Sequence, residues 1–283
     1  MPTIISPLAQ VDPQAQLGQN VFVGPFCLIG PNVVLGDDCR LDSHVTLTGN
    51  TLIGRRNRFW PNAVIGAEPQ DKSYVDGRTG VAIGDDNQFR EGITVNRGAE
   101  KEDGVTRIGH RNLLMSNSHV AHNCHVHNDA ILVNGVLLGG HVHIQDRAII
   151  SGNSAVHHFT TIGRLAFVGG CSKVVRDVPP FMMADGNDDH RMATINLVGL
   201  QRAGVSKETI ALIKQAHRVL FRENKRLADA RTHFETLTNG QLPAELVELF
   251  NFCAAQSRGK MGRGREIFRD QGFTPPSSQL KAA

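Results

Sequence analysis

The stretch that decides the fold runs from residue 108 to residue 143 and reads, in groups of six, IGHRNL LMSNSH VAHNCH VHNDAI LVNGVL LGGHVH. Each group begins with an aliphatic residue, and the same position stays aliphatic as far as Val174, twelve times in succession. If roughly one residue in four is Ile, Leu or Val, such a run has a chance probability on the order of one in ten million. The six-residue period is therefore a property of the fold.

The same period governs the N-terminal part of the chain, from Ile5 to Ile65, and returns in phase at Ile83. Six is a multiple of the strand period of two, so each repeat can supply one short strand and one corner. Three repeats make a triangular coil of 18 residues, and coils stack about 4.8 Å apart. Polar stretches interrupt the period at residues 67–80 and 96–107, and we expect both to project as loops because a stacked coil cannot absorb them.

The pattern changes after the Pro-Pro pair at residues 179–180, which ends the stack. Helical spacing of apolar residues follows, beginning at Ser206. The sequence thus predicts a mainly β fold, a parallel β-helix of hexapeptide repeats followed by a small C-terminal α-helical domain. We expect the β-helix domain to span residues 1–180, the connector and helical domain residues 181–272, and a frayed tail residues 273–283.

Composition excludes several classes of protein. With 283 residues, 40% of them hydrophobic and 20% charged, the chain is an ordinary globular one. It has no signal-like start and no apolar run long enough to span a bilayer, which predicts a cytoplasmic protein without membrane insertion. Its five cysteines show no C-x-x-C spacing, so neither a disulfide framework nor a structural zinc site is indicated.

Charge points to a protein partner more than to nucleic acid. The net charge of +3 is too small to argue for nucleic-acid binding. Between Arg202 and Arg269, however, the sequence contains 13 Lys and Arg residues and only 7 Asp and Glu residues. This local excess predicts an acidic partner near the C-terminal part.

Histidines are concentrated in the second run of repeats, where eight of the 13 fall between His119 and His158. The 18-residue coil places His122, Gly140 and His158 in one column about 10 Å tall, with His141 beside the glycine. An imidazole can serve as a general base near neutral pH. A bare glycine lets a reacting group approach the backbone and leaves an N–H to face developing negative charge. The column therefore combines a candidate base with a candidate donor for negative charge.

Two other interpretations of the histidines stay open. Imidazoles could hold zinc, as in carbonic anhydrases built on hexapeptide repeats. A histidine on an outward corner could also simply be solvated. For His125, His127 and His143 we favour the solvated state.

Several short motifs resemble those of one enzyme family over nearly the whole chain. They are NLLM at 112–115, HVAH at 119–122, AVH at 155–157, VGGCS at 168–172, DVPP at 177–180 and GLQR at 199–202. Together they resemble the acyl-carrier-protein-dependent UDP-N-acetylglucosamine O-acyltransferases, the first enzymes of lipid A synthesis. The resemblance implies a left-handed β-helix, a homotrimer with active sites between neighbouring subunits, and a C-terminal helical part that helps to dock the acidic carrier protein.

The resemblance also implies roles for individual residues. His122 would be the general base that takes the proton of the sugar 3-hydroxyl, and the Gly140 N–H would stabilise the oxyanion. The carrier protein's phosphopantetheine thioester would be a co-substrate, and no cofactor or metal would be needed. Gly170 would form the floor of the acyl pocket and leave room for a long chain. The other expected contacts are Asp71, His119, His141, His157 and His158 with sugar, diphosphate or acyl chain, and Asn196 and Arg202 with the nucleotide.

The chain departs from the family pattern at Asn123, at His158 and over the segment 187–194. Asn123 follows the predicted base, where family members carry an Asp that orients it, and an amide cannot stabilise an imidazolium with a full charge. His158 stands where a Gln is common, and the segment 187–194 is one residue longer than usual. Three alternatives follow: N-acylation of a UDP-amino-sugar, a zinc-dependent carbonic-anhydrase-like protein, and a non-catalytic scaffold that binds sugar nucleotides.

Overall fold

The structure is a computed structural model that describes residues 2–185, 191–270, 272 and 274. The expected tail over residues 273–283 lies outside the described residues except for Thr274, and so do residues 187–190 of the longer segment at 187–194.

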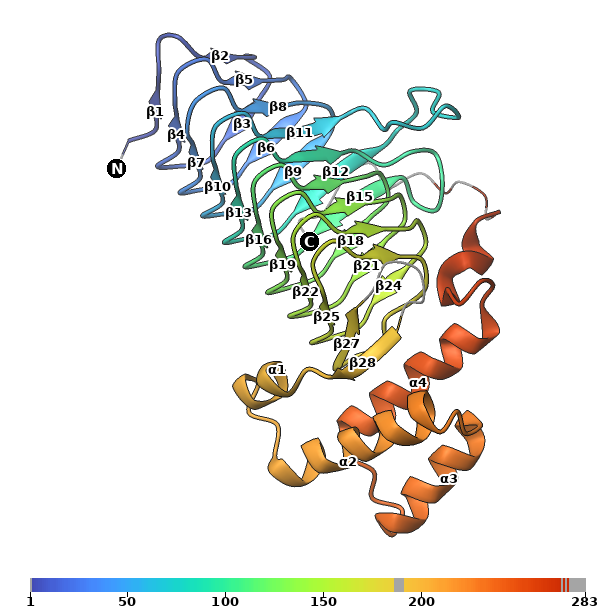
Figure 1. The fold of residues 1–283 in the computed structure, drawn as a ribbon. Helices are drawn as coiled ribbons and strands as arrows, with labels where there is room; N and C mark the ends of the chain where they lie inside the picture. The colour runs from blue at the N-terminus through green and yellow to red at the C-terminus, as the bar shows by residue number, and fades with distance from the viewer. Residues whose placement is uncertain (1, 186–190, 271, 273, 275–283) are drawn as a thin grey trace.

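Three parallel sheets run along the length of a triangular prism (Figure 1). Sheet A contains β1 (Ile4–Ile5), β4 (Phe22–Val23), β7 (Arg40–Leu41), β10 (Arg58–Phe59), β13 (Gln88–Phe89), β16 (Leu113–Leu114), β19 (Ile131–Leu132), β22 (Ile149–Ile150), β25 (Phe167–Val168), β27 (Met182–Asp185) and β28 (Arg191–Ile195). Sheet B contains β2 (Gln10–Val11), β5 (Leu28–Ile29), β8 (Thr46–Leu47), β11 (Val64–Ala67), β14 (Thr94–Asn96), β17 (His119–Val120), β20 (Leu137–Leu138), β23 (Ala155–Val156) and β26 (Lys173–Val174). Sheet C contains β3 (Gln16–Leu17), β6 (Val33–Leu35), β9 (Thr51–Ile53), β12 (Gly80–Ile83), β15 (Val105–Ile108), β18 (His125–Val126), β21 (His143–Ile144) and β24 (Thr161–Ile162).

The corners between strands repeat as regularly as the strands. At every sixth residue of the second run the backbone adopts a positive φ, for example +56° at Asn123, +63° at His141 and +62° at Phe159. A single residue in this left-handed region turns the chain sharply enough to start the next side of the triangle. Each coil in this run has 18 residues, so residues 18 apart lie one above another. The pairing of His125 on β18 with His143 on β21 is an example.

The aliphatic ladder fills the prism. The repeat residues from Val23 to Val174 are almost completely buried, and Phe59 stacks on Phe89 with ring centroids 4.7 Å apart. Each side chain buried in this way contributes roughly 1.5–3 kcal/mol relative to an exposed one. Ile5, in the first coil, stays 44% exposed because no coil covers it.

The two interruptions of the repeat leave the prism as loops between β11 and β12 and between β14 and β15, on one side of the coil stack (Figure 1). At the other end, β27 and β28 pair antiparallel and lead into the helical domain. This domain contains α1 (Leu197–Arg202), α2 (Lys207–His217), the π-helix η1 (Arg218–Arg222), α3 (Leu227–Leu237), α4 (Ala244–Arg258) and the 3-10 helix η2 (Gly264–Phe268).

The helical domain has a second apolar core, which begins under the last coils with Leu165 and Phe181 and continues to Phe234 and Phe250. After α4 the chain returns along the prism, so that η2 lies beside sheet C (Figure 1). Arg265 of η2 pairs there with Glu102 of the second loop at 2.6 Å. Among the described helices, none has the length and apolar character needed to cross a bilayer.

Candidate functional site

The predicted column forms at the corner between sheets B and C. His122 and Gly140 occupy successive coils and touch: a methyl group added at Gly140 would lie 2.6 Å from both Cε1 and Nε2 of the imidazole. Any side chain at this position would therefore displace the ring. Within the described residues the Gly140 N–H donates no hydrogen bond, so it remains available to an oxyanion.

Asn123 orients His122. The Asn123 Oδ1 lies 2.9 Å from His122 Nδ1 and also accepts the Ala99 N–H at 2.9 Å. Its Nδ2 donates to the carbonyls of Ala99 at 3.3 Å and Lys101 at 2.7 Å. These loop partners fix which end of the amide faces the ring, and an amide oxygen can only accept. His122 therefore donates from Nδ1 and keeps the lone pair of Nε2 free to act as a base.

The second ring nitrogen of His122 faces a charged pair. Asp71 Oδ2 lies 3.8 Å from Nε2 and accepts the Lys101 ammonium at 2.8 Å. Burial alone would raise the pKa of Asp71, but the hydrogen bonds from Lys101 and Ser73 hold it well below its ordinary value. Asp71 is therefore ionised at neutral pH. Burial lowers the pKa of His122 below 6.5, more than its bond to Asn123 raises it, so the base is neutral at pH 7.

His141 forms the inner wall of the site. The ring is only 3% exposed and stacks on Phe159 with centroids 4.3 Å apart. Its Nδ1 lies 3.3 Å from Glu102 Oε2, although neither ring nitrogen makes a well-aligned hydrogen bond. Burial alone would raise the pKa of Glu102, but His141 and Arg265 hold it below its ordinary value. The second loop and η2 thus reach the same corner.

A cavity of about 200 Å³ opens at this corner. It is lined by Asp71, Lys101, His122, Gly140, His141, His158, Phe159 and Arg269. The Arg269 guanidinium lies over the Phe159 ring at 4.9 Å. Burial, and next the neighbouring His157, lower the pKa of His158 to about 4, so this ring is neutral as well.

The other predicted residues lie apart from the cavity within one chain. His119 is on sheet B and shares a hydrogen bond with Thr94 at 2.7 Å. His157 contacts His158, with ring centroids 3.7 Å apart and the ring planes tilted by 43°. Gly170 lies at the corner between sheets A and B, where an added methyl group would meet nothing closer than 3.6 Å.

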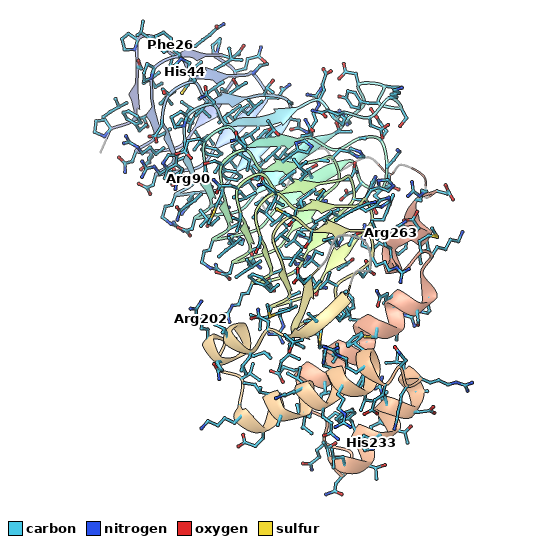
Figure 2. All side chains as sticks on the ribbon, viewed as in Figure 1. Phe26, His44, Arg90, Arg202, His233 and Arg263 are labelled. Atoms are coloured by element: carbon cyan, nitrogen blue, oxygen red, sulfur yellow. The ribbon has the colours of Figure 1, made fainter. Side chains whose placement is uncertain are left out.

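Asn196 and Arg202 line a much larger cavity of about 930 Å³ between sheet A and helices α1 and α2 (Figure 2). Asn196 caps α1: its Oδ1 accepts the Gly199 N–H at 2.9 Å and its Nδ2 donates to the Leu165 carbonyl at 2.8 Å. Its side chain therefore already has a structural role.

Sequence reasoning missed Lys101, Glu102, Arg265 and Arg269. The first two lie in a loop that the broken period marks as projecting, and this break is the only signal in the sequence. Arg265 and Arg269 lie in the segment after α4 that returns along the prism. No repeat in the sequence predicts where this segment packs.

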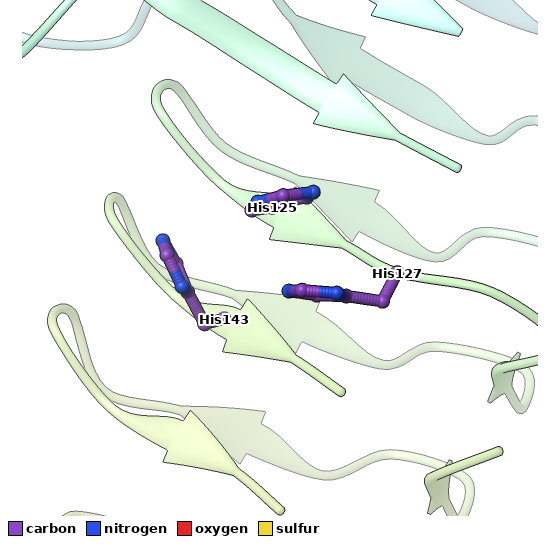
Figure 3. Close-up of side chains that lie close together, drawn as sticks. All are labelled: His125, His127 and His143. Carbon is purple, nitrogen blue, oxygen red and sulfur yellow. The ribbon is translucent and has the colours of Figure 1, made fainter. Parts of the chain in front are cut away.

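A solvated state is expected for each of His125, His127 and His143, and the structure shows in addition that the three residues form a cluster. The three rings are half-buried and lie against one another on sheet C (Figure 3). In the part of the chain that the structure describes, they are also the only group of three or more potential ligands with atoms within 4.8 Å of one another. Among the described residues, the corner with His122 and His141 has no such group.

Comparisons with known proteins agree with this geometry. A family model described as UDP N-acetylglucosamine O-acyltransferase, domain 2, matches residues 177–261. A model of bacterial transferase hexapeptides, six repeats, matches residues 14–49.

Curated relatives carry the name acyl-carrier-protein-dependent UDP-N-acetylglucosamine O-acyltransferase. The protein from Synechocystis sp. is 52% identical over 64% of this chain and 64% of its own length, so the match spans just under two thirds of that relative. The protein from Gloeothece citriformis is 48% identical over 69% of this chain and 70% of its own. The protein from Rhizobium johnstonii is 44% identical over 77% of this chain and 79% of its own.

Solved structures extend the likeness to the helical domain. The UDP-N-acetylglucosamine acyltransferase of Bacteroides fragilis superimposes with a TM-score of 0.84 at 35% identity, covering 89% of this chain and 97% of that one. The enzyme of Francisella novicida gives a TM-score of 0.83 at 37% identity, over 89% and 91%. The expected fold class, a left-handed parallel β-helix of hexapeptide repeats with a small C-terminal helical domain, is confirmed. The chain is an acyltransferase and belongs to the family of UDP-N-acetylglucosamine O-acyltransferases.

Proposed function

We propose that this protein transfers a 3-hydroxyacyl group from the thioester of acyl carrier protein to the 3-hydroxyl of UDP-N-acetylglucosamine, the first step of lipid A synthesis. The observation that carries the proposal is the contact between His122, whose Nε2 lone pair is free, and the bare Gly140, whose N–H has no partner among the described residues.

The chemistry follows from these two groups. Nε2 of His122 removes the hydroxyl proton as the sugar oxygen attacks the thioester carbonyl. The Gly140 N–H faces the oxyanion of the tetrahedral intermediate. When the intermediate collapses, the carbon–sulfur bond breaks and the imidazolium returns its proton to the departing thiolate. Each group is typically worth about 10²-fold or more in rate. The reaction requires no cofactor beyond the phosphopantetheine thioester.

We further propose that the enzyme is a homotrimer whose sites lie between subunits. Gly170, Asn196 and Arg202 lie on other sides of the prism from His122, so a neighbouring copy would have to bring them to the base. The basic excess of the helical domain supports docking of the acidic carrier protein. Five free cysteines, three of them buried, suit the reducing cytoplasm.

The direct test is acyl transfer from 3-hydroxyacyl carrier protein to UDP-N-acetylglucosamine, run beside the analogue with a 3-amino group. We expect the hydroxyl acceptor to be preferred. A preference for the amine would establish the N-acyltransferase alternative. Binding of UDP-N-acetylglucosamine without transfer to either acceptor would establish the scaffold alternative.

Mixed oligomers test the shared site. His122→Ala and Arg202→Ala subunits, each inactive alone, are unfolded, mixed and refolded together. If one site takes its base from one subunit and Arg202 from another, mixed trimers contain intact sites and recover part of the activity. No recovery would place both residues in a single subunit's site.

A further inference from the structure

Sheet C carries three histidines that the proposed reaction does not use. His125 and His127 are two residues apart on one coil, so the strand period points both side chains outward. His143 lies on the next coil in direct register with His125 (Figure 3). A His-x-His pair and a third His from the neighbouring strand thus converge on one patch.

The rings are close enough to share a ligand. One nitrogen from each ring lies within 4.8 Å of the other two. The ring of His125 stacks on that of His127 with centroids 4.0 Å apart and meets that of His143 edge-on at 5.4 Å. Nitrogens bound to one tetrahedral zinc ion lie about 3.3 Å apart, since each bond is about 2.0 Å long. To bind one ion, the stacked rings of His125 and His127 would have to rotate out of their nearly parallel arrangement so that their lone pairs converge.

The ring nitrogens of these three histidines are not used in hydrogen bonds to other described residues. Their backbone N–H groups, by contrast, pair along sheet C. Three imidazoles without side-chain partners thus lie together on one patch, an arrangement that a shared cation would stabilise.

Two arginines near the rings act against a cation, and each is paired with a carboxylate. Arg107 lies beside His125 in register, but its charge is paired with Asp103 at 2.6 Å. Arg265, near His125 and His143, is paired with Glu102 at 2.6 Å. The carboxylate of Asp146 acts on His127 with the favourable sign.

We propose that His125, His127 and His143 form a binding site for one divalent transition-metal ion of the zinc type. Three neutral imidazoles suit Zn²⁺, Co²⁺, Ni²⁺ and Cu²⁺ better than Mg²⁺ or Ca²⁺, which prefer oxygen ligands. A fourth position opens toward a cleft of about 500 Å³ that His125 and His143 line together with Glu102, Arg107 and Arg265. The ion would clamp two successive coils of sheet C and is separate from the acyl-transfer chemistry.

Zinc titration tests the site. Full-length protein without a polyhistidine tag is freed of metal with a chelator and titrated calorimetrically with ZnCl₂. We expect one ion per chain and a melting temperature that rises with zinc concentration. Co²⁺ in place of zinc should give the visible absorption of a tetrahedral nitrogen site.

Two variants and one control locate the binding. His127→Gln and His143→Gln should each weaken zinc binding by at least about 100-fold. His233→Gln should leave it unchanged, because His233 is a lone exposed histidine on α3, in the helical domain (Figure 2). Circular dichroism confirms that each variant is folded. The proposal is overturned if the wild type binds no zinc at 100 µM, or if both folded cluster variants bind it as tightly as the control.

This readout requires no substrate, so its outcome is independent of the proposed acyltransferase activity. Metal-free protein should also retain its transfer rate within about twofold, since no cluster residue lines the catalytic cavity.

Discussion

Two histidine groups lie within two coils of each other and differ in what surrounds them. At the corner, His122 and His141 face an amide, carboxylates and a bare glycine. On sheet C, His125, His127 and His143 face mainly one another. Directional partners fix one tautomer and leave one nitrogen for proton transfer, whereas rings without such partners leave several lone pairs for one cation. The same side chain thus acquires two chemistries from its neighbours.

The largest effect should come from the base. His122→Ala should lower kcat/KM for acyl transfer by about 10³-fold, because it removes the ring that contacts Gly140 and that Asn123 orients with its Nε2 lone pair free. Initial rates with labelled acyl carrier protein measure it. His233→Ala is the control and should stay within about twofold of wild type. Zinc binding should survive in both variants; a His122→Ala enzyme with nearly full activity would contradict the assignment.

Gly140→Ala should come next, with a loss of about 10²-fold. The added methyl group would lie 2.6 Å from the His122 ring and force the base away from the attacking hydroxyl. Gly30→Ala is a matched control, since its methyl group would meet nothing closer than 3.6 Å. Kinetics of both folded variants decide the point. Equal loss in the two would show that the effect is one of folding and not of this contact.

Asn123→Asp should change the pH dependence of the reaction. In the wild type, burial lowers the pKa of His122, so the base form and kcat/KM should persist below pH 6.5 and fall only at lower pH. A carboxylate at 123 would stabilise the imidazolium, raise this pKa and move the acid limb upward, with a roughly tenfold loss near pH 6.

The same change should also destabilise the fold. A carboxylate cannot donate to the carbonyls of Ala99 and Lys101 as the amide does, which costs about 2 kcal/mol in free energy of unfolding. Asn117→Asp, at an exposed corner with the same positive φ, serves as control in pH-rate profiles and urea melts. An unmoved acid limb would show that residue 123 does not tune the base.

Glu102→Gln should have the smallest effect, a roughly 3- to 10-fold loss of kcat with little change in KM. The carboxylate links His141 to Arg265 and positions the wall of the site without lining its cavity. Glu223→Gln, which breaks an exposed pair with Arg218, should leave kcat unaltered. A rise in KM alone would indicate that Glu102 acts on substrate binding instead.

The repeat made much of this protein predictable. Constant 18-residue coils fix which residues stack, and so the aliphatic core and the contact between His122 and Gly140 follow from counting. The same arithmetic aligns His125 with His143. The arithmetic did not predict that the His127 ring would lie against the rings of His125 and His143. Ring orientation depends on side-chain packing and not on register.

The sequence by itself determined the prism, its corners and the column that holds the base, because a strict period converts sequence separation into spatial neighbourhood. Only the tertiary structure decided what completes each histidine group. The loop carbonyls that orient Asn123, the link from Glu102 to Arg265 and the position of Arg269 over Phe159 all come from segments without a period. Where such segments return is set by packing between distant parts of the chain, which local pattern does not encode.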